Sequence, residues 1–160
     1  MNALVKDPVC HMDVAADSFH VEYLGVPYAF CSMQCKERFV ENPHLYIGVP
    51  GRKAPAQLGT VVIKRRRFVL AAPLNAMQAD LVKQALFEMM GMQAVNIDGD
   101  QIEIQYDLMQ VAAEQIADQL VLIGAKLGES WVDRLKLGFI NYLEECEIGS
   151  MEVKPPKSCH

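Results

Sequence analysis

The sequence lacks three features that would assign it to common functional classes. It has no run of about 18 apolar residues, which a membrane helix needs, and its first residues lack the basic and apolar segments of a secretory signal. Its net charge of -5 gives no sign of the basic surface that general nucleic-acid binding requires. We therefore expect a cytosolic protein that neither inserts into membranes nor binds nucleic acid, with a packed core because 51% of its 160 residues are hydrophobic.

The sequence also lacks the pattern of a disulfide framework and of a known enzyme site. Its five cysteines are odd in number and unevenly spaced, and in a reducing cytosol they should remain thiols. There is no glycine-rich phosphate loop and no convincing pair of nucleophile and base, so no enzyme activity is predicted. Metal binding is then the leading use for the cysteines.

Turn signals divide the chain into sections. Asn42-Pro43 and the proline- and glycine-containing run from Val49 to Pro55 interrupt any regular pattern. The predicted organisation is a small domain over 1–48, a linker over 49–59, a second domain over 60–128, a helix over 129–149 and a flexible tail over 150–160.

The first section is predicted to contain a hairpin followed by a helix. Residues 19–23 and 26–30 are β-prone and flank the turn Leu24-Gly25, and the helix runs from Ser32 to Glu41. The cysteines of this section therefore lie on both sides of a hairpin.

The second section is predicted to be α+β. A β-prone stretch over 61–70 precedes a helix, and strands 94–97 and 102–106 alternate about a turn at Gly99. Three helices are predicted from their apolar faces. The first has the face Met77, Leu81, Ala85 and Met89, and the second has Met109, Ala113, Ile116, Leu120 and Ile123. The third begins after a cap at Ser130 and has the face Trp131, Leu135, Phe139, Leu143 and Cys146. With a closing strand at 125–127, this order fits a ferredoxin-like βαββαβ domain. Glu144, Glu145 and Glu147 are expected on the solvated face of the last helix.

Three cysteines can close around one soft metal ion. Cys31 and Cys35 flank the predicted start of the first helix, and Cys10 would come from a loop that Pro8 stiffens. The helix dipole should favour a thiolate at Cys35, with help from Lys36 and Arg38. The predicted metal ligands are therefore Cys10, Cys31 and Cys35.

The number of ligands bears on the identity of the metal. Three thiolates suit Cu(I), whereas structural Zn(II) usually takes four ligands. His11, His20, the thioether of Met12 and the terminal pair Cys159-His160 are candidates for a further ligand, and the sequence does not rank them. Two alternatives stay open: the cysteines are simply buried apolar residues, or a metal only staples a small treble-clef-like fold.

The first section resembles a known family of metal-binding domains. The residues that carry the resemblance are Asp7-Pro8-Val9-Cys10-His11-Met12, Gly25, Tyr28, Phe30-Cys31-Ser32, Cys35, Phe39, Pro43 and Tyr46. They are similar to a YHS domain of the TRASH-like group, found beside heavy-metal P-type ATPases and in metal-resistance proteins. The resemblance implies that Cys10, Cys31 and Cys35 bind metal, and His11 departs from it because the motif usually has glycine there.

The second section resembles, more weakly, a heavy-metal-associated ferredoxin-like domain. Those domains carry a cysteine pair before the first helix, where this chain has residues 72–77 without cysteine. The resemblance therefore implies a docking or dimerisation surface rather than a second copper site.

Two functional hypotheses follow. In the first, the protein binds Cu(I) and passes it to a partner such as a heavy-metal P-type ATPase. In the second, Zn(II) holds the small domain together and the second domain acts as an interaction or regulatory module, for example by forming a homodimer. A transfer site should release its metal without unfolding, whereas a structural site should unfold when the metal is removed.

Overall fold

The computed structural model describes residues 3–125, 127–128 and 131–154. The chain forms two compact units, one made of the residues up to Val61 together with those from Glu147 onward, the other of Val62–Cys146. Helices and strands are both present, which confirms the predicted α+β class. None of the helices in the described ranges combines the length and apolar character needed to cross a bilayer.

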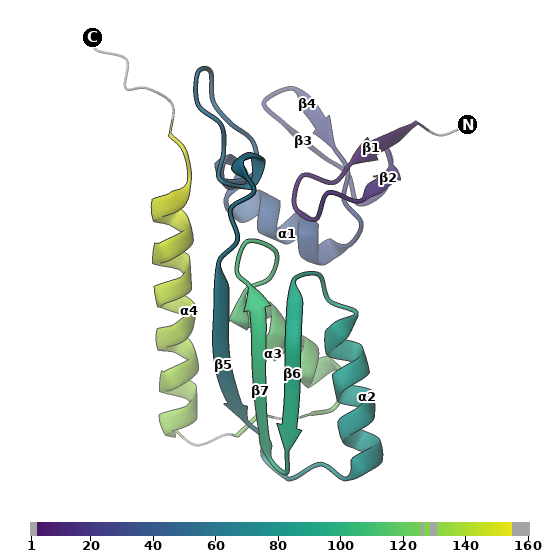
Figure 1. Cartoon of the computed structure of the whole chain (residues 1–160), viewed down its shortest axis with the longest axis vertical. Coiled ribbons are helices and arrows are strands. Elements are labelled where there is room, and N and C mark those ends of the chain that lie inside the picture. Colours follow the sequence, from purple (N-terminus) through teal and green to yellow (C-terminus); the bar gives the residue numbers. More distant parts are fainter. Residues whose placement is uncertain (1–2, 126, 129–130, 155–160) are drawn as a thin grey trace. The chain divides into compact units, whose positions relative to one another are not determined.

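The first unit is built from two short antiparallel hairpins and one helix (Figure 1). Its elements are β1 (Leu4–Lys6) paired with β2 (Asp13–Ala15), β3 (Val21–Tyr23) paired with β4 (Val26–Tyr28), α1 (Met33–Glu41), and the 3-10 turns η1 (Pro43–Leu45) and η2 (Ala56–Leu58). The β3–β4 turn places Leu24 at a φ of 51° and Gly25 at 78°, as a type I′ turn requires. The predicted hairpin is confirmed.

Helix α1 begins and ends where the sequence predicts. The Oγ atom of Ser32 accepts a hydrogen bond from the amide of Cys35 at 3.4 Å, so Ser32 caps the helix. The helix ends at Glu41, because the proline at position 43 disfavours a helical conformation for the residue before it. The helix is therefore fixed at both ends by its own sequence.

An aromatic cluster holds α1 in place. The ring of Phe39 contacts four other rings, those of Tyr23, Tyr28, Phe30 and Tyr46. Cys35 lies one helical turn before Phe39 on the same buried face of the helix. The packing of Phe39 therefore also fixes the direction in which Cys35 faces.

Residues near the C-terminus complete the first unit. The carboxylate of Glu152 accepts a hydrogen bond from the amide of His44 at 2.9 Å, and the amide of Val153 donates to the carbonyl of His44 at 3.2 Å. Ile148 is buried as well. These contacts lie partly in the segment predicted to be a flexible tail, of which residues 155–160 are outside the described ranges.

The second unit is an antiparallel sheet packed with helices. Its elements are β5 (Ile63–Val69), α2 (Ala76–Phe87), β6 (Met92–Asp98), β7 (Gln101–Asp107), α3 (Ala113–Leu122) and α4 (Trp131–Met151), whose last residues belong to the first unit. The sheet order is β5-β7-β6, and α3 passes behind the central strand (Figure 1). The predicted strand, helix, hairpin and helix are all present in this order.

The predicted closing strand at 125–127 is reduced to a single bridge in the described residues. Leu127 pairs with Leu70, and the amide of Gly128 donates to the carbonyl of Val69 at 2.8 Å, while residue 126 is not described. Few residues are available for a strand here, because the turn at Gly124, with a φ of 85°, follows α3 and α4 already begins at Trp131. The bridge still lies beside β5, where a ferredoxin-like fold places its last strand.

The predicted apolar face of α2 is partly wrong. Val82 and Leu86 are buried, whereas Met77 is 74% exposed and Leu81 is also exposed. A fourfold spacing drifts around a helix of 3.6 residues per turn, so a line that starts at Met77 moves onto the buried side only near its end. The helix itself is confirmed.

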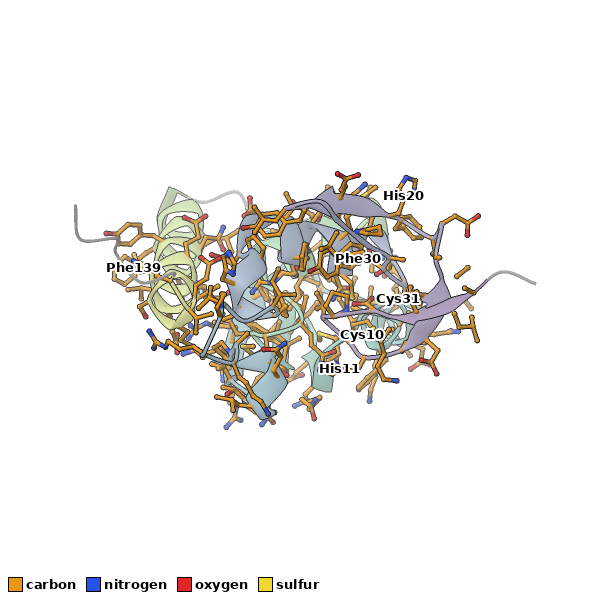
Figure 2. All side chains as sticks on the ribbon, turned by 90° about the horizontal axis from the view of Figure 1, so that it is seen from above. Cys10, His11, His20, Phe30, Cys31 and Phe139 are labelled. Atoms are coloured by element: carbon orange, nitrogen blue, oxygen red, sulfur yellow. The ribbon has the colours of Figure 1, made fainter. Side chains whose placement is uncertain are left out.

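The apolar face predicted for α4 is wrong in its described part. Phe139 is 62% exposed (Figure 2), and Leu143 and Cys146 are exposed too. The cap at Ser130 and the side chains of 131–135 lie outside the description. Glu144, expected in solvent, is 3% exposed instead.

Glu144 determines which side of α4 faces the sheet. Its carboxylate accepts hydrogen bonds from the Tyr106 hydroxyl and, at 2.9 Å, from the amide of Ala113, and it lies 3.6 Å from Nε of Arg66. These groups are buried polar groups that need a partner. The need to satisfy them outweighs the burial of Phe139.

Replacing Glu144 with alanine should lower the free energy of unfolding by about 2–4 kcal/mol, because it leaves buried donors without an acceptor. The matched control is Glu145→Ala, which changes an exposed residue of the same helix and should have an effect within about 0.5 kcal/mol. The urea unfolding midpoint measures both. Equal effects of the two substitutions would contradict this role of Glu144.

Candidate metal centre

Cys10 lies in a tight loop between β1 and β2. The amide of Asp7 donates to the carbonyl of Met12, and the amide of His11 donates to the carbonyl of Asp7, each at 2.9 Å. His11 has a φ of 65°, in the left-handed region that favours glycine. Histidine occupies this conformation more readily than most residues with a side chain do.

Cys31 and Cys35 are positioned by the hairpin and the helix. Cys31 follows β4 and comes directly before the cap residue Ser32, and Cys35 lies in the first turn of α1. Cys10 and Cys31 are partly exposed, whereas Cys35 is buried. The three predicted ligands thus come from the two segments that the sequence indicates.

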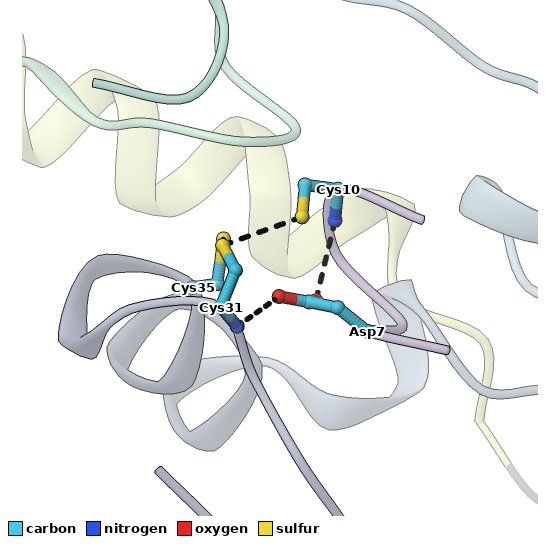
Figure 3. A group of neighbouring side chains, drawn as sticks. All are labelled: Asp7, Cys10, Cys31 and Cys35. Atoms are coloured by element: carbon cyan, nitrogen blue, oxygen red, sulfur yellow. Dashed lines mark hydrogen bonds between the residues drawn. The ribbon is translucent and has the colours of Figure 1, made fainter. Parts of the chain in front are cut away.

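The structure brings the three sulfur atoms together. The Sγ atoms of Cys10 and Cys31 lie 3.4 Å apart, and those of Cys31 and Cys35 lie 3.5 Å apart (Figure 3). Sulfurs bound at about 2.3 Å to one ion are separated by about 4 Å. Each of these two pairs therefore needs to spread by only about 0.5 Å for its sulfurs to bind one metal ion.

Sequence reasoning missed Asp7 as a member of the cluster. A carboxylate oxygen of Asp7 lies with the three sulfurs in one group whose candidate ligand atoms are all within 4.8 Å of one another. Asp7 is fully buried and accepts hydrogen bonds from backbone amides of both cysteine-bearing segments. The signal in the sequence is an aspartate at the start of a turn, because its side chain commonly accepts hydrogen bonds from the backbone amides that follow it.

The protonation pattern differs from the one predicted. A hydrogen bond from Cys35 lowers the pKa of Cys10 to about 7, while burial raises the pKa of Cys31 to about 11. The same hydrogen bond, together with burial, raises the pKa of Cys35 above its ordinary value. The raised pKa of Cys35 favours its thiol form, in contrast to the thiolate that the helix dipole predicts there.

The other candidate ligands are not gathered at the site. His11 and His20 are exposed, and within the described ranges neither belongs to the cluster. Nδ1 of His20 lies 3.3 Å from the carbonyl of Asp17. The side chain of Met12 is exposed, and the pair Cys159-His160 lies outside the described residues.

Comparison with known proteins identifies the domain that holds the cluster. Residues 5–49 match the YHS domain, which confirms the resemblance of the first section. No curated protein and no solved structure shows a significant match to the chain. The YHS domain and the cluster of cysteines with Asp7 together indicate metal binding.

The lowered pKa of Cys10 predicts its reactivity in the metal-free protein. Only the thiolate is alkylated, so the rate at Cys10 should rise about tenfold per pH unit at low pH and level off above a pH of about 7. Mass spectrometry after brief iodoacetamide treatment measures the rate at each cysteine. Cys35→Ala removes the hydrogen-bond donor and should move the midpoint of the pH dependence at Cys10 upward. In the wild-type protein, alkylation of Cys35 before Cys10 would show that the low pKa does not belong to Cys10.

Replacing His11 with glycine should leave metal affinity unchanged, because the imidazole is outside the cluster. It should raise the free energy of unfolding by up to about 1 kcal/mol by relieving the left-handed conformation. His11→Ala is the control, since it removes the imidazole but keeps the Cβ atom and hence the strain. Loss of metal affinity in both variants would show instead that His11 is a ligand.

Proposed function

We propose that the protein binds one Cu(I) ion through Cys10, Cys31 and Cys35 and passes it to a partner by ligand exchange. The observation that carries this proposal is the preformed group of three thiols, with sulfur separations of 3.4 and 3.5 Å. Soft thiolate ligands favour Cu(I), together with Zn(II) and iron–sulfur clusters, over hard cations. A site with three sulfurs also matches the low coordination number of Cu(I).

The exposure of the thiols supports transfer. Cys10 and Cys31 are partly exposed and Cys35 is buried, so a donor from another protein can approach the ion from the side of Cys10 and Cys31. In the exchange, an incoming thiolate binds the ion as one protein thiolate leaves and takes up a proton. The copper stays Cu(I), and no catalytic step or redox partner is involved.

The proposed partner is a heavy-metal P-type ATPase or another metal-transfer protein in a reducing cytosol. The second unit has the strand, helix, hairpin and helix order expected of a heavy-metal-associated domain, with a single bridge in place of the closing strand and no cysteine in residues 72–77. It would serve as a recognition surface, or as a contact between two copies of the chain, rather than as a copper site.

One observation favours a structural Zn(II) site as the second candidate. Asp7 offers a carboxylate oxygen in the same cluster as the three sulfurs, which gives four candidate ligand atoms. Four ligands in a tetrahedron are typical of structural zinc. In this case, the metal would stabilise the small domain and the second unit would carry the interaction function.

Competitive titration of the reduced 160-residue protein with Cu(I) and Zn(II) against chelators tests the proposal, with far-ultraviolet circular dichroism recorded in parallel. The full chain is needed, because residues from Glu147 onward belong to the first unit. We expect tight Cu(I) binding and a fold that persists without metal. Cys35→Ser should abolish binding, and Cys146→Ser, which changes an exposed thiol, should have no effect.

Preference for Zn(II) with loss of structure on its removal would contradict copper transfer and support the structural role. Binding that survives Cys35→Ser would contradict both candidates.

A further inference from the structure

We propose that Asp7 is a positioning residue that ties the two cysteine-bearing segments together and keeps its backbone hydrogen bonds when the metal is bound. This inference rests on the proposed function, since it concerns the same site. It assigns Asp7 a place outside the ligand set, although its carboxylate lies among the sulfurs.

The two oxygens of Asp7 bind two different parts of the chain. Oδ1 accepts hydrogen bonds from the amides of Val9 at 2.7 Å and of Cys10 at 3.3 Å. Oδ2 accepts a hydrogen bond from the amide of Cys31 at 2.8 Å (Figure 3). One side chain thus holds the backbone of Cys10 and that of Cys31, which are far apart in the sequence.

The burial of Asp7 explains why these bonds should persist. The residue is 0% exposed, and a buried carboxylate is tolerated when several donors compensate for the loss of water. Hydrogen bonds between amides and a carboxylate are stronger than those between neutral groups. An oxygen that turned to the metal would leave at least one amide of a cysteine-bearing segment without its acceptor.

The consequence concerns the ligand set. Oδ1 of Asp7 already accepts two hydrogen bonds and the bond from Cys31 orients Oδ2, so under this proposal the described part of the chain supplies three sulfurs to the ion and no oxygen. The hydrogen bonds from Asp7 to the two cysteine-bearing segments, which we call the Asp7 clamp, then set the spacing of Cys10 and Cys31 before the metal binds. The ion can then accept a fourth ligand from the transfer partner.

The variant Asp7→Asn tests the clamp. Asparagine has the same shape, but its amide nitrogen cannot accept a hydrogen bond, so one of the two segments loses its anchor. We expect the Cu(I) dissociation constant to rise about 10- to 100-fold, the usual effect of removing a group that orients metal ligands. The matched control is Asp13→Asn, which changes an exposed carboxylate of the same unit and should alter affinity less than about twofold. Unchanged affinity in Asp7→Asn would overturn the proposal.

Amide hydrogen exchange provides a second readout that does not need the variant to bind metal. In the metal-free protein, the amides of Val9, Cys10 and Cys31 should be protected, and at least one of them should lose protection in Asp7→Asn. In the wild-type protein, their protection should remain when Cu(I) is added. Loss of protection at Cys31 on metal addition would show that Asp7 turns to the ion, and the positioning role would be wrong.

The two readouts separate this inference from the proposed function. If the wild-type protein fails to bind Cu(I), the proposed function is wrong. If the amides of Val9, Cys10 and Cys31 are equally protected from hydrogen exchange in Asp7→Asn, the positioning role of Asp7 is wrong, whatever the metal result. If Asp7→Asn does not fold, the wild-type comparison with and without Cu(I) still decides whether Asp7 stays on the backbone amides.

Discussion

The buried carboxylate of Asp7 is the contact on which the geometry of the metal centre depends. Cys10 lies in the β1–β2 loop and Cys31 precedes α1, and the backbone amides of both bind to this one side chain. The aromatic packing of Phe39 holds the helix that carries Cys35. These contacts of Asp7 and Phe39 bring the three sulfurs together.

The second unit uses the same physical device. Glu144 is buried and accepts a hydrogen bond from the amide of Ala113, and Asp107 is buried and accepts hydrogen bonds from the amides of Val62 and Met109. In each case, an acidic side chain joins segments that are distant in the sequence, because backbone donors at loops and helix starts have no partner within their own element. Apolar periodicity does not detect such contacts.

The sequence predicted the elements better than their faces. Local signals sufficed for the β3–β4 turn and for α1, since Gly25 and Ser32 act on their immediate neighbours. The orientation of α4 could not be predicted, because it follows from hydrogen bonds of Glu144 to residues of other elements. At the metal centre, the three cysteines were recognisable from residue type and family resemblance. The place of Asp7 in the cluster and the lowered pKa of Cys10 both depend on burial and on distances between atoms. These arise only when the chain folds.

X-ray absorption spectroscopy of the reduced protein loaded with one equivalent of Cu(I) counts the atoms bound to the metal and therefore tests the proposed ligand set. We expect copper bonded to sulfur alone, from the thiols of Cys10, Cys31 and Cys35. Copper bonded to oxygen or nitrogen as well, or to only two sulfurs, would show that this ligand set is wrong.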